Sequence, residues 1–149
     1  MEPTSGMVTF LTSEAISFKA RQQPRTTTST SDAEYIVATY TVKDLVWVQR
    51  FIKELKIQVM GKAHLYCDNQ SAIRLIKNPE FYERSKHIDI RYHFIREHYQ
   101  DGLFEISYVR SEDQKADMFT KTLTGARFKV LRESIGCIDA SSVKNERGC

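Results

Sequence analysis

The sequence lacks the long apolar run that a membrane span requires, and its first residues do not have the composition of a secretory signal peptide. It has only three cysteines, Cys67, Cys137 and Cys149, and their spacing matches no metal-binding motif. This cysteine usage argues against a disulfide framework and predicts a reducing intracellular location, cytoplasmic or nuclear. There are no internal repeats and no low-complexity tract beyond a threonine-rich loop at residues 21–31.

The composition is that of an ordinary globular protein. The chain has 149 residues, of which 41% are hydrophobic and 28% are charged. This length predicts one domain that is large enough to bury a core. The net charge of +3 suits a polyanionic partner, and it equally suits an ordinary solvated surface.

Hydrophobic periodicity predicts alternating strands and helices. Strands are expected at residues 6–11, 15–19, 63–67 and 103–109, the first two forming a hairpin with its turn at 12–14. Helices are expected at 32–55, from 68 to about 78, at 88–100, in a segment that carries Asp117, and at 128–135. Capping boxes at 31–34 and 111–114 predict two of the helix starts. The order β-β-α-β-α-α-β-α predicts an α/β fold with a mixed sheet flanked by helices, over residues 1–136, and a disordered tail at 137–149.

Asp68 is the first candidate for chemistry. It follows the apolar strand at 63–67 and precedes a helical pattern. The carboxyl ends of strands in an open α/β sheet are where ligands bind. A single acid in this place is also a good helix N-cap, so other carboxylates must converge on it before it indicates a site.

Five short motifs occur in an order that resembles a known family. They are TSG at 4–6, SDAEY at 31–35, YCDNQSA at 66–72, KHIDIRYH at 86–93 and ADMFTK at 116–121. Together they resemble the ribonuclease H domain of copia-type retrotransposon Pol polyproteins. The resemblance covers residues 4–136 and implies the ribonuclease H fold, a five-stranded mixed sheet flanked by helices. It also implies cleavage of the RNA strand of an RNA–DNA hybrid during reverse transcription, with the reverse-transcriptase part of the polyprotein as a possible partner.

The resemblance assigns Glu34, Asp68 and Asp117 as catalytic residues and as ligands of two Mg²⁺ ions. In-line hydrolysis of a phosphodiester needs an activated water and a stabilised leaving oxygen, and two cations about 4 Å apart supply both. Mg²⁺ prefers oxygen ligands, so carboxylates from separate elements are the expected protein ligands.

Each of the three acids has a simpler interpretation. Glu34 could be only the glutamate of the first capping box, and Asp68 only an N-cap. Asp117 could only form an i,i+4 ion pair with Lys121 on a solvated helix face.

Nucleic-acid contacts are expected from Asn69 and Gln70, beside Asp68, and from the basic residues Lys86, His87 and Arg91. RNA–DNA hybrids are bound through backbone and 2′-hydroxyl contacts, for which such side chains are suited. A solvated helix face is the alternative interpretation for the basic residues. The spacing of the histidines does not predict a zinc site.

The sequence departs from the family where its first strand is expected. That strand, which carries the first catalytic aspartate, comes shortly before the TSG motif in the family, and here residues 1–3 stand in its place. We expect unpaired edges on the strands at 6–11 and 63–67, and little or no nuclease activity from this polypeptide alone. Two functions therefore compete: a ribonuclease H, and a catalytically dead retroelement remnant that binds nucleic acid weakly at most. Oligomeric state is left open.

Overall fold

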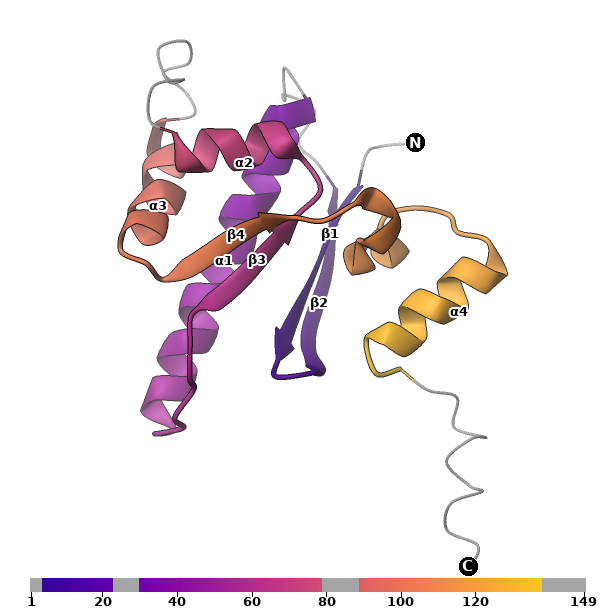
Figure 1. Ribbon diagram of the computed structural model, residues 1–149, viewed down its shortest axis with the longest axis horizontal. Coiled ribbons are helices and arrows are strands. Elements are labelled where there is room, and N and C mark those ends of the chain that lie inside the picture. The colour runs from indigo at the N-terminus through magenta and orange to yellow at the C-terminus, as the bar shows by residue number, and fades with distance from the viewer. Residues whose placement is uncertain (1–3, 23–29, 79–88, 138–149) are drawn as a thin grey trace, which may run out of the picture. The chain divides into compact units, whose positions relative to one another are not determined.

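A computed structural model describes residues 4–22, 30–78 and 89–137 (Figure 1). These residues fall into two compact units. Unit 1 contains residues 4–22 and 115–137, and unit 2 contains residues 30–78 and 89–114. Among the helices in these ranges, none combines the length and hydropathy needed to span a membrane. The prediction of a tail at 137–149 lies outside the described residues except for Cys137, which is exposed.

Unit 1 is built on an antiparallel hairpin. Strands β1 (Thr4–Leu11) and β2 (Glu14–Gln22) pair directly, with a register shift between Thr9 and Phe10. Thr12 adopts a positive φ of 58° in the connecting turn. The hairpin and its turn are confirmed. The C-terminal part of unit 1 contains the 3-10 helix η3 (Lys115–Phe119) and helix α4 (Gly125–Ser134).

Unit 2 combines three α-helices with a parallel strand pair. Its elements are α1 (Thr30–Glu54), β3 (Ala63–Cys67), α2 (Gln70–Lys77), α3 (Asp89–Gln100), β4 (Phe104–Tyr108) and the 3-10 helix η2 (Ser111–Asp113). Strands β3 and β4 pair in parallel, from Ala63 opposite Phe104 to Cys67 opposite Tyr108. Parallel strands need a long crossover connection, and α2 and α3 lie in that connection.

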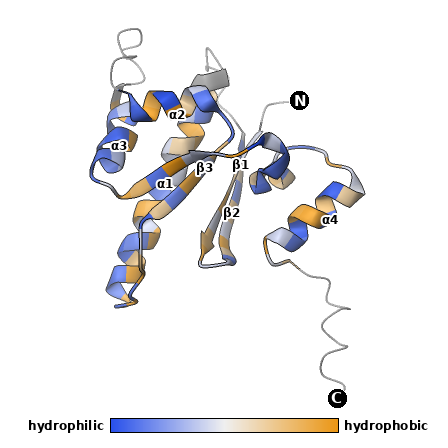
Figure 2. Ribbon diagram, in the orientation of Figure 1, coloured by the Kyte–Doolittle hydropathy of each residue, from blue (hydrophilic) through white to orange (hydrophobic). Residues whose placement is uncertain are grey.

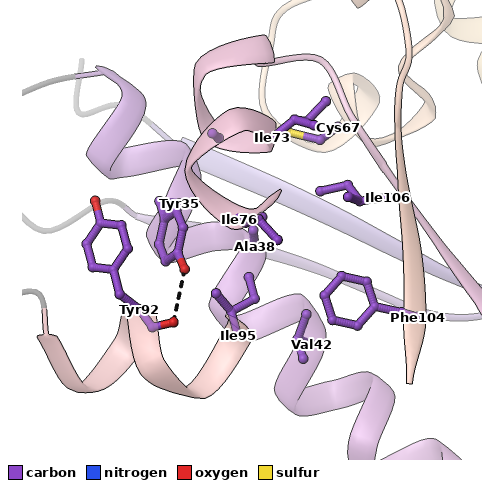
Figure 3. Packing of buried hydrophobic residues seen from close by; sticks show 11 residues of the cluster. Tyr35, Ala38, Val42, Cys67, Ile73, Ile76, Tyr92, Ile95, Phe104 and Ile106 are labelled. Atoms are coloured by element: carbon purple, nitrogen blue, oxygen red, sulfur yellow. Dashed lines mark hydrogen bonds between the residues drawn. The ribbon is translucent and has the colours of Figure 1, made fainter. Parts of the chain in front are cut away.

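A continuous hydrophobic cluster joins the elements of unit 2 (Figure 3). The rings of Tyr35 and Tyr92 stack with centroids 3.9 Å apart, and the Tyr35 hydroxyl donates to the Tyr92 carbonyl at 3.3 Å. The buried members are Tyr35, Ala38, Val42, Cys67, Ala72, Ile73, Ile76, Tyr92, Ile95, Phe104 and Ile106. Helix α1 contributes Tyr35, Ala38 and Val42 to this cluster, whereas Leu55, just after the helix, is 53% exposed.

The expected single mixed sheet is not what the described strands form. They make two separate two-stranded sheets, one antiparallel and one parallel. Among these strands, β1 pairs only with β2, and β3 pairs only with β4. Each pairing joins strands that are consecutive in the chain: β1 and β2 form the hairpin, and β3 and β4 are joined by one crossover. The α/β class is therefore confirmed, and the single sheet is corrected to two. Within the described residues β1 and β3 each pair with one strand, as expected for the strands at 6–11 and 63–67.

The capping box predicted at 111–114 is wrong, whereas α1 begins at Thr30, one residue before the box predicted at 31–34. Ser111 begins the short η2 helix, and the residue before it, Arg110, makes no side-chain capping bond. Asp117 accordingly lies on a 3-10 helix, where an α-helix was expected. Helices α2 and α3 end close to their predicted residues, the latter before Gly102 with φ of 71°.

Candidate functional site

Asp68 lies where the sequence places it, directly after β3 and before α2. The Val109 amide donates to the Cys67 carbonyl at 3.0 Å, so the chain leaving β4 runs beside the end of β3. It thereby brings Ser111 to Asp68, and the Ser111 hydroxyl donates to Asp68 Oδ2 at 3.2 Å. Two parallel strands thus present their carboxyl ends, and a half-buried carboxylate, at one edge.

The alternative interpretation of Asp68 as a helix cap is wrong, because Asn69 has that role. Asn69 is the N-cap of α2, and its Oδ1 accepts a hydrogen bond from the Ala72 amide at 3.0 Å. The Asp68 side chain is therefore not needed to start α2. The side chain of Asn69, for which a nucleic-acid contact is predicted, already caps a helix. The side chain of Gln70, for which the same contact is predicted, is exposed.

Glu34 lies near the start of α1. It lies half-buried between Ala33 and Tyr35, which are both buried. Burial raises the pKa of the Cys67 thiol to about 11, a hydrogen bond with the Asn69 backbone opposes this, and the negative charges of Glu34 and Asp68 raise it further. Both charges therefore act on the Cys67 thiol, that of Asp68 from the next residue along the chain and that of Glu34 from α1.

Asp117 has a different environment within unit 1. Its carboxylate is 6% exposed, and both of its oxygens accept hydrogen bonds from Lys121 Nζ, at 3.1 and 3.0 Å. Arg127 Nη2 of α4 lies 3.8 Å from Asp117 Oδ2. The i,i+4 pair with Lys121 is confirmed, although the carboxylate is buried and the helix is 3-10.

The three acids differ in how well they suit Mg²⁺. Glu34 and Asp68 offer half-buried carboxylate oxygens, which are the ligand type that Mg²⁺ prefers. Asp117 does not fit, because an ammonium group occupies both of its oxygens. Within residues 4–22, 30–78 and 89–137, no group of three or more His, Cys, Asp and Glu side chains is arranged to hold a metal ion.

The basic residues are only partly described. Arg91 is exposed on α3. Lys86 and His87 lie outside the described residues. Of these three basic residues, the structure therefore describes only Arg91.

Sequence reasoning missed two residues that contact the candidate acids, and it missed the capping role of Asn69. Ser111 was assigned to a capping box, although its place just after β4 in a parallel pair could have predicted its contact with Asp68. Arg127 lies ten residues from Asp117 and on a different helix. Helical periodicity relates residues within one helix, so it could not predict this contact. The capping role of Asn69 was missed because Asp68, the residue before it, is also a good N-cap.

Comparison with known proteins gives three relatives that are retrovirus-related Pol polyproteins of plant transposons. The chain is 40% identical over 122 residues to that of transposon TNT 1-94 from Nicotiana tabacum, which is 82% of this chain. It is 36% identical to the polyprotein of transposon RE2 from Arabidopsis thaliana over 135 residues, or 91% of this chain. It is 35% identical to that of RE1 from the same plant over 133 residues, or 89% of this chain.

No family model matches the chain, and no solved structure matches it. The chain spans about 9% of the length of each polyprotein. Identity of 35–40% over most of the chain nevertheless establishes common ancestry with that segment. The chain is thus homologous to a region of copia-type retrotransposon Pol polyproteins.

Proposed function

We propose that this chain is the ribonuclease H-like region of a retrotransposon Pol polyprotein and cleaves the RNA strand of RNA–DNA hybrids. The observation that carries the proposal is the half-buried carboxylate of Asp68 at the carboxyl ends of the parallel strands β3 and β4, where it accepts a hydrogen bond from Ser111. The ordered motifs that contain Glu34 and Asp68 and the homology to Pol polyproteins support it.

The proposed chemistry uses the two carboxylates as ligands of Mg²⁺. A bound Mg²⁺ supplies Lewis-acid activation of water and charge stabilisation at the phosphate. The Ser111 hydroxyl, which donates to Asp68 Oδ2 at 3.2 Å, holds that carboxylate in one orientation. The capping bond of Asn69 fixes the start of α2 and so the backbone that carries Asp68.

The hybrid would be bound through its backbone. Gln70 and Arg91 are exposed and provide an amide and a guanidinium group for phosphate and 2′-hydroxyl contacts. Lys86 and His87 would add positive charge in the segment before α3.

A chimera tests the proposal. The aligned segment of the tobacco polyprotein is replaced by this chain, and cleavage of a labelled RNA–DNA hybrid is measured with Mg²⁺. We expect the chimera to cleave the RNA strand, and Asp68→Asn or Glu34→Gln to lower the rate by at least about a hundredfold, since each removes a metal-binding charge. The unaltered polyprotein is the reference.

The matched control is Asp101→Asn, which removes an exposed carboxylate of unit 2 remote in sequence from both acids. It is expected to leave the cleavage rate unchanged. An unaltered polyprotein that cleaves beside a folded chimera that does not would overturn the proposal. So would equal rates for the chimera and its Asp68→Asn variant.

The second candidate function is nucleic-acid binding without cleavage. The pairing of Asp117 with Lys121 favours it, because a neutralised carboxylate is a poor metal ligand. For this function we expect the hybrid to bind the full chain with the same affinity in Mg²⁺ and in EDTA. We also expect the chimera not to cleave it.

A further inference from the structure

Asp117 is the centre of a small ion-pair cluster. Its buried carboxylate contacts Lys121 through both oxygens and lies 3.8 Å from Arg127 on α4. Its backbone carbonyl also accepts the Thr120 hydroxyl at 3.2 Å. A buried carboxylate is stable only when it is paired, and both cations reach this one from the C-terminal side of the chain.

Helix α4 has few apolar contacts of its own. Leu131 is its only buried residue, and Ile135 follows just after it. Phe128 and Val130 are 43% and 65% exposed. Figure 2 shows both hydrophobic and hydrophilic residues along the helix. Burial of one or two side chains holds a ten-residue helix weakly, so other contacts must contribute.

Charged contacts are present at both ends of α4. Arg127 lies in its first turn, where the helix dipole disfavours a cation, and the Asp117 carboxylate compensates for this charge. At the other end, Lys115 Nζ donates to the Ser134 carbonyl at 3.1 Å and lies 4.7 Å from the centre of the Phe10 ring. A cation at a helix C-terminus is favourable.

Segment η3 provides a firm base for these contacts. A Cβ atom on Gly6 of β1 would lie 2.7 Å from the Ala116 carbonyl oxygen and 3.3 Å from Phe119 Cβ. The rings of Phe18 and Phe119 stack with centroids 5.0 Å apart. Since η3 is packed closely on the hairpin, side chains on η3 can hold α4 in place.

We propose that Asp117 and Lys115 dock α4 onto η3 by charge, and that Asp117 is engaged in this docking in place of binding a metal ion. The four residues of this α4 clamp are Lys115, Asp117, Lys121 and Arg127. The docking is therefore sensitive to salt. Only the statement on metal binding rests on the proposed function.

Hydrogen–deuterium exchange of the full chain tests the docking. Asp117→Asn is expected to speed exchange of the α4 amides by roughly tenfold or more, because it breaks a buried ion pair. Arg127→Met is expected to have a smaller effect in the same peptides. Lys129→Met is the matched control, since it removes an exposed cation from the same helix, and it should change exchange by less than about twofold.

Salt gives a second measurement on folded protein. Raising NaCl from about 0.05 M to about 1 M should speed α4 exchange in the unaltered chain, and less so in Asp117→Asn, where the pairing is already lost. Exchange of α4 that is the same in the unaltered chain and in Asp117→Asn, at both salt concentrations, would overturn the docking.

Mn²⁺ titration followed by water proton relaxation tests the metal statement separately. We expect Asp117→Asn to bind Mn²⁺ like the unaltered chain, and Asp68→Asn to lose roughly tenfold in affinity. A tenfold loss in Asp117→Asn would overturn the assignment of Asp117 to the clamp. Unchanged Mn²⁺ affinity in Asp68→Asn would contradict the proposed function but not the α4 clamp. The clamp is then tested by the exchange measurement.

Discussion

The Cys67 thiol reports on the two carboxylates of the candidate site. Burial, with smaller contributions from Glu34 and Asp68, raises its pKa from 9.0 to about 11. Because the thiolate is the reactive form, we predict that iodoacetamide alkylates Cys67 much more slowly than the exposed Cys137 at neutral pH. Peptide mass spectrometry after timed labelling measures both rates.

The sign of the pH dependence follows from the raised pKa. Any stability that comes from the protonated Cys67 thiol is fully present below about pH 9 and is lost as the pH rises through about 11. Glu34→Gln removes one charge that raises the pKa, so it should speed labelling of Cys67 modestly. Labelling of Cys67 as fast as that of Cys137 would contradict the burial on which this prediction depends.

Asn69 and Asp68 are adjacent, yet they have separate roles. We predict that Asn69→Ala lowers the free energy of unfolding by about 1 kcal/mol, because it removes the Oδ1 acceptor for the Ala72 amide. Asp68→Asn, which keeps the shape and leaves this cap in place, should change it by less than about 0.5 kcal/mol. Urea denaturation measures both free energies of unfolding. Equal losses in the two variants would mean that Asp68 contributes to the cap as much as Asn69 does.

At the scale of elements, the contact between β1 and η3 depends on a missing side chain. We predict that Gly6→Ala destabilises unit 1 by about 1–3 kcal/mol, because its Cβ would meet the Ala116 carbonyl oxygen at 2.7 Å and backbone has to move. The measurement is exchange of the η3 and hairpin amides.

Gly125→Ala is the control for this prediction. Gly125 is the first residue of α4, and a Cβ there meets no atom within 4 Å. The change should therefore be neutral or slightly stabilising. If both substitutions had the same effect, the close approach at Gly6 would be irrelevant to stability.

The elements that the sequence predicted well are those with a strong local pattern. Strand β3 alternates between exposed His64 and Tyr66 and inward Leu65 and Cys67, and both ends of α2 have clear turn residues. The segment from Ser111 to Phe119 was predicted as one α-helix because a capping pattern was present. Two short 3-10 helices form there, and a capping pattern does not distinguish them from an α-helix.

The candidate site was predictable to the same extent. The positions of Asp68 after β3 and of Glu34 near the start of α1 follow from local patterns. The ion pairs of Asp117 with Lys121 and Arg127 were predictable only for Lys121, four residues away. Pairing between distant segments depends on tertiary packing, which is also why one sheet was expected in place of two.

At the scale of the whole molecule, the two units have unequal cores. The buried cluster of eleven hydrophobic residues lies entirely in unit 2. Unit 1 buries four apolar residues among those described, namely Met7, Ala116, Leu131 and Ile135. Since burial of apolar surface is the main stabilising contribution, unit 2 should be the more stable part of the chain.

We therefore predict slow amide exchange in α1, α3, β3 and β4 and faster exchange in β1, β2 and α4. Ile95 is fully buried in the cluster, and Ile95→Ala should cost about 2–5 kcal/mol and speed exchange throughout unit 2. Val130→Ala, at a position that is 65% exposed on α4, should cost less than about 0.5 kcal/mol. Protection that is uniform across both units would contradict the prediction, because a single cooperative core would then have to include the hairpin and α4.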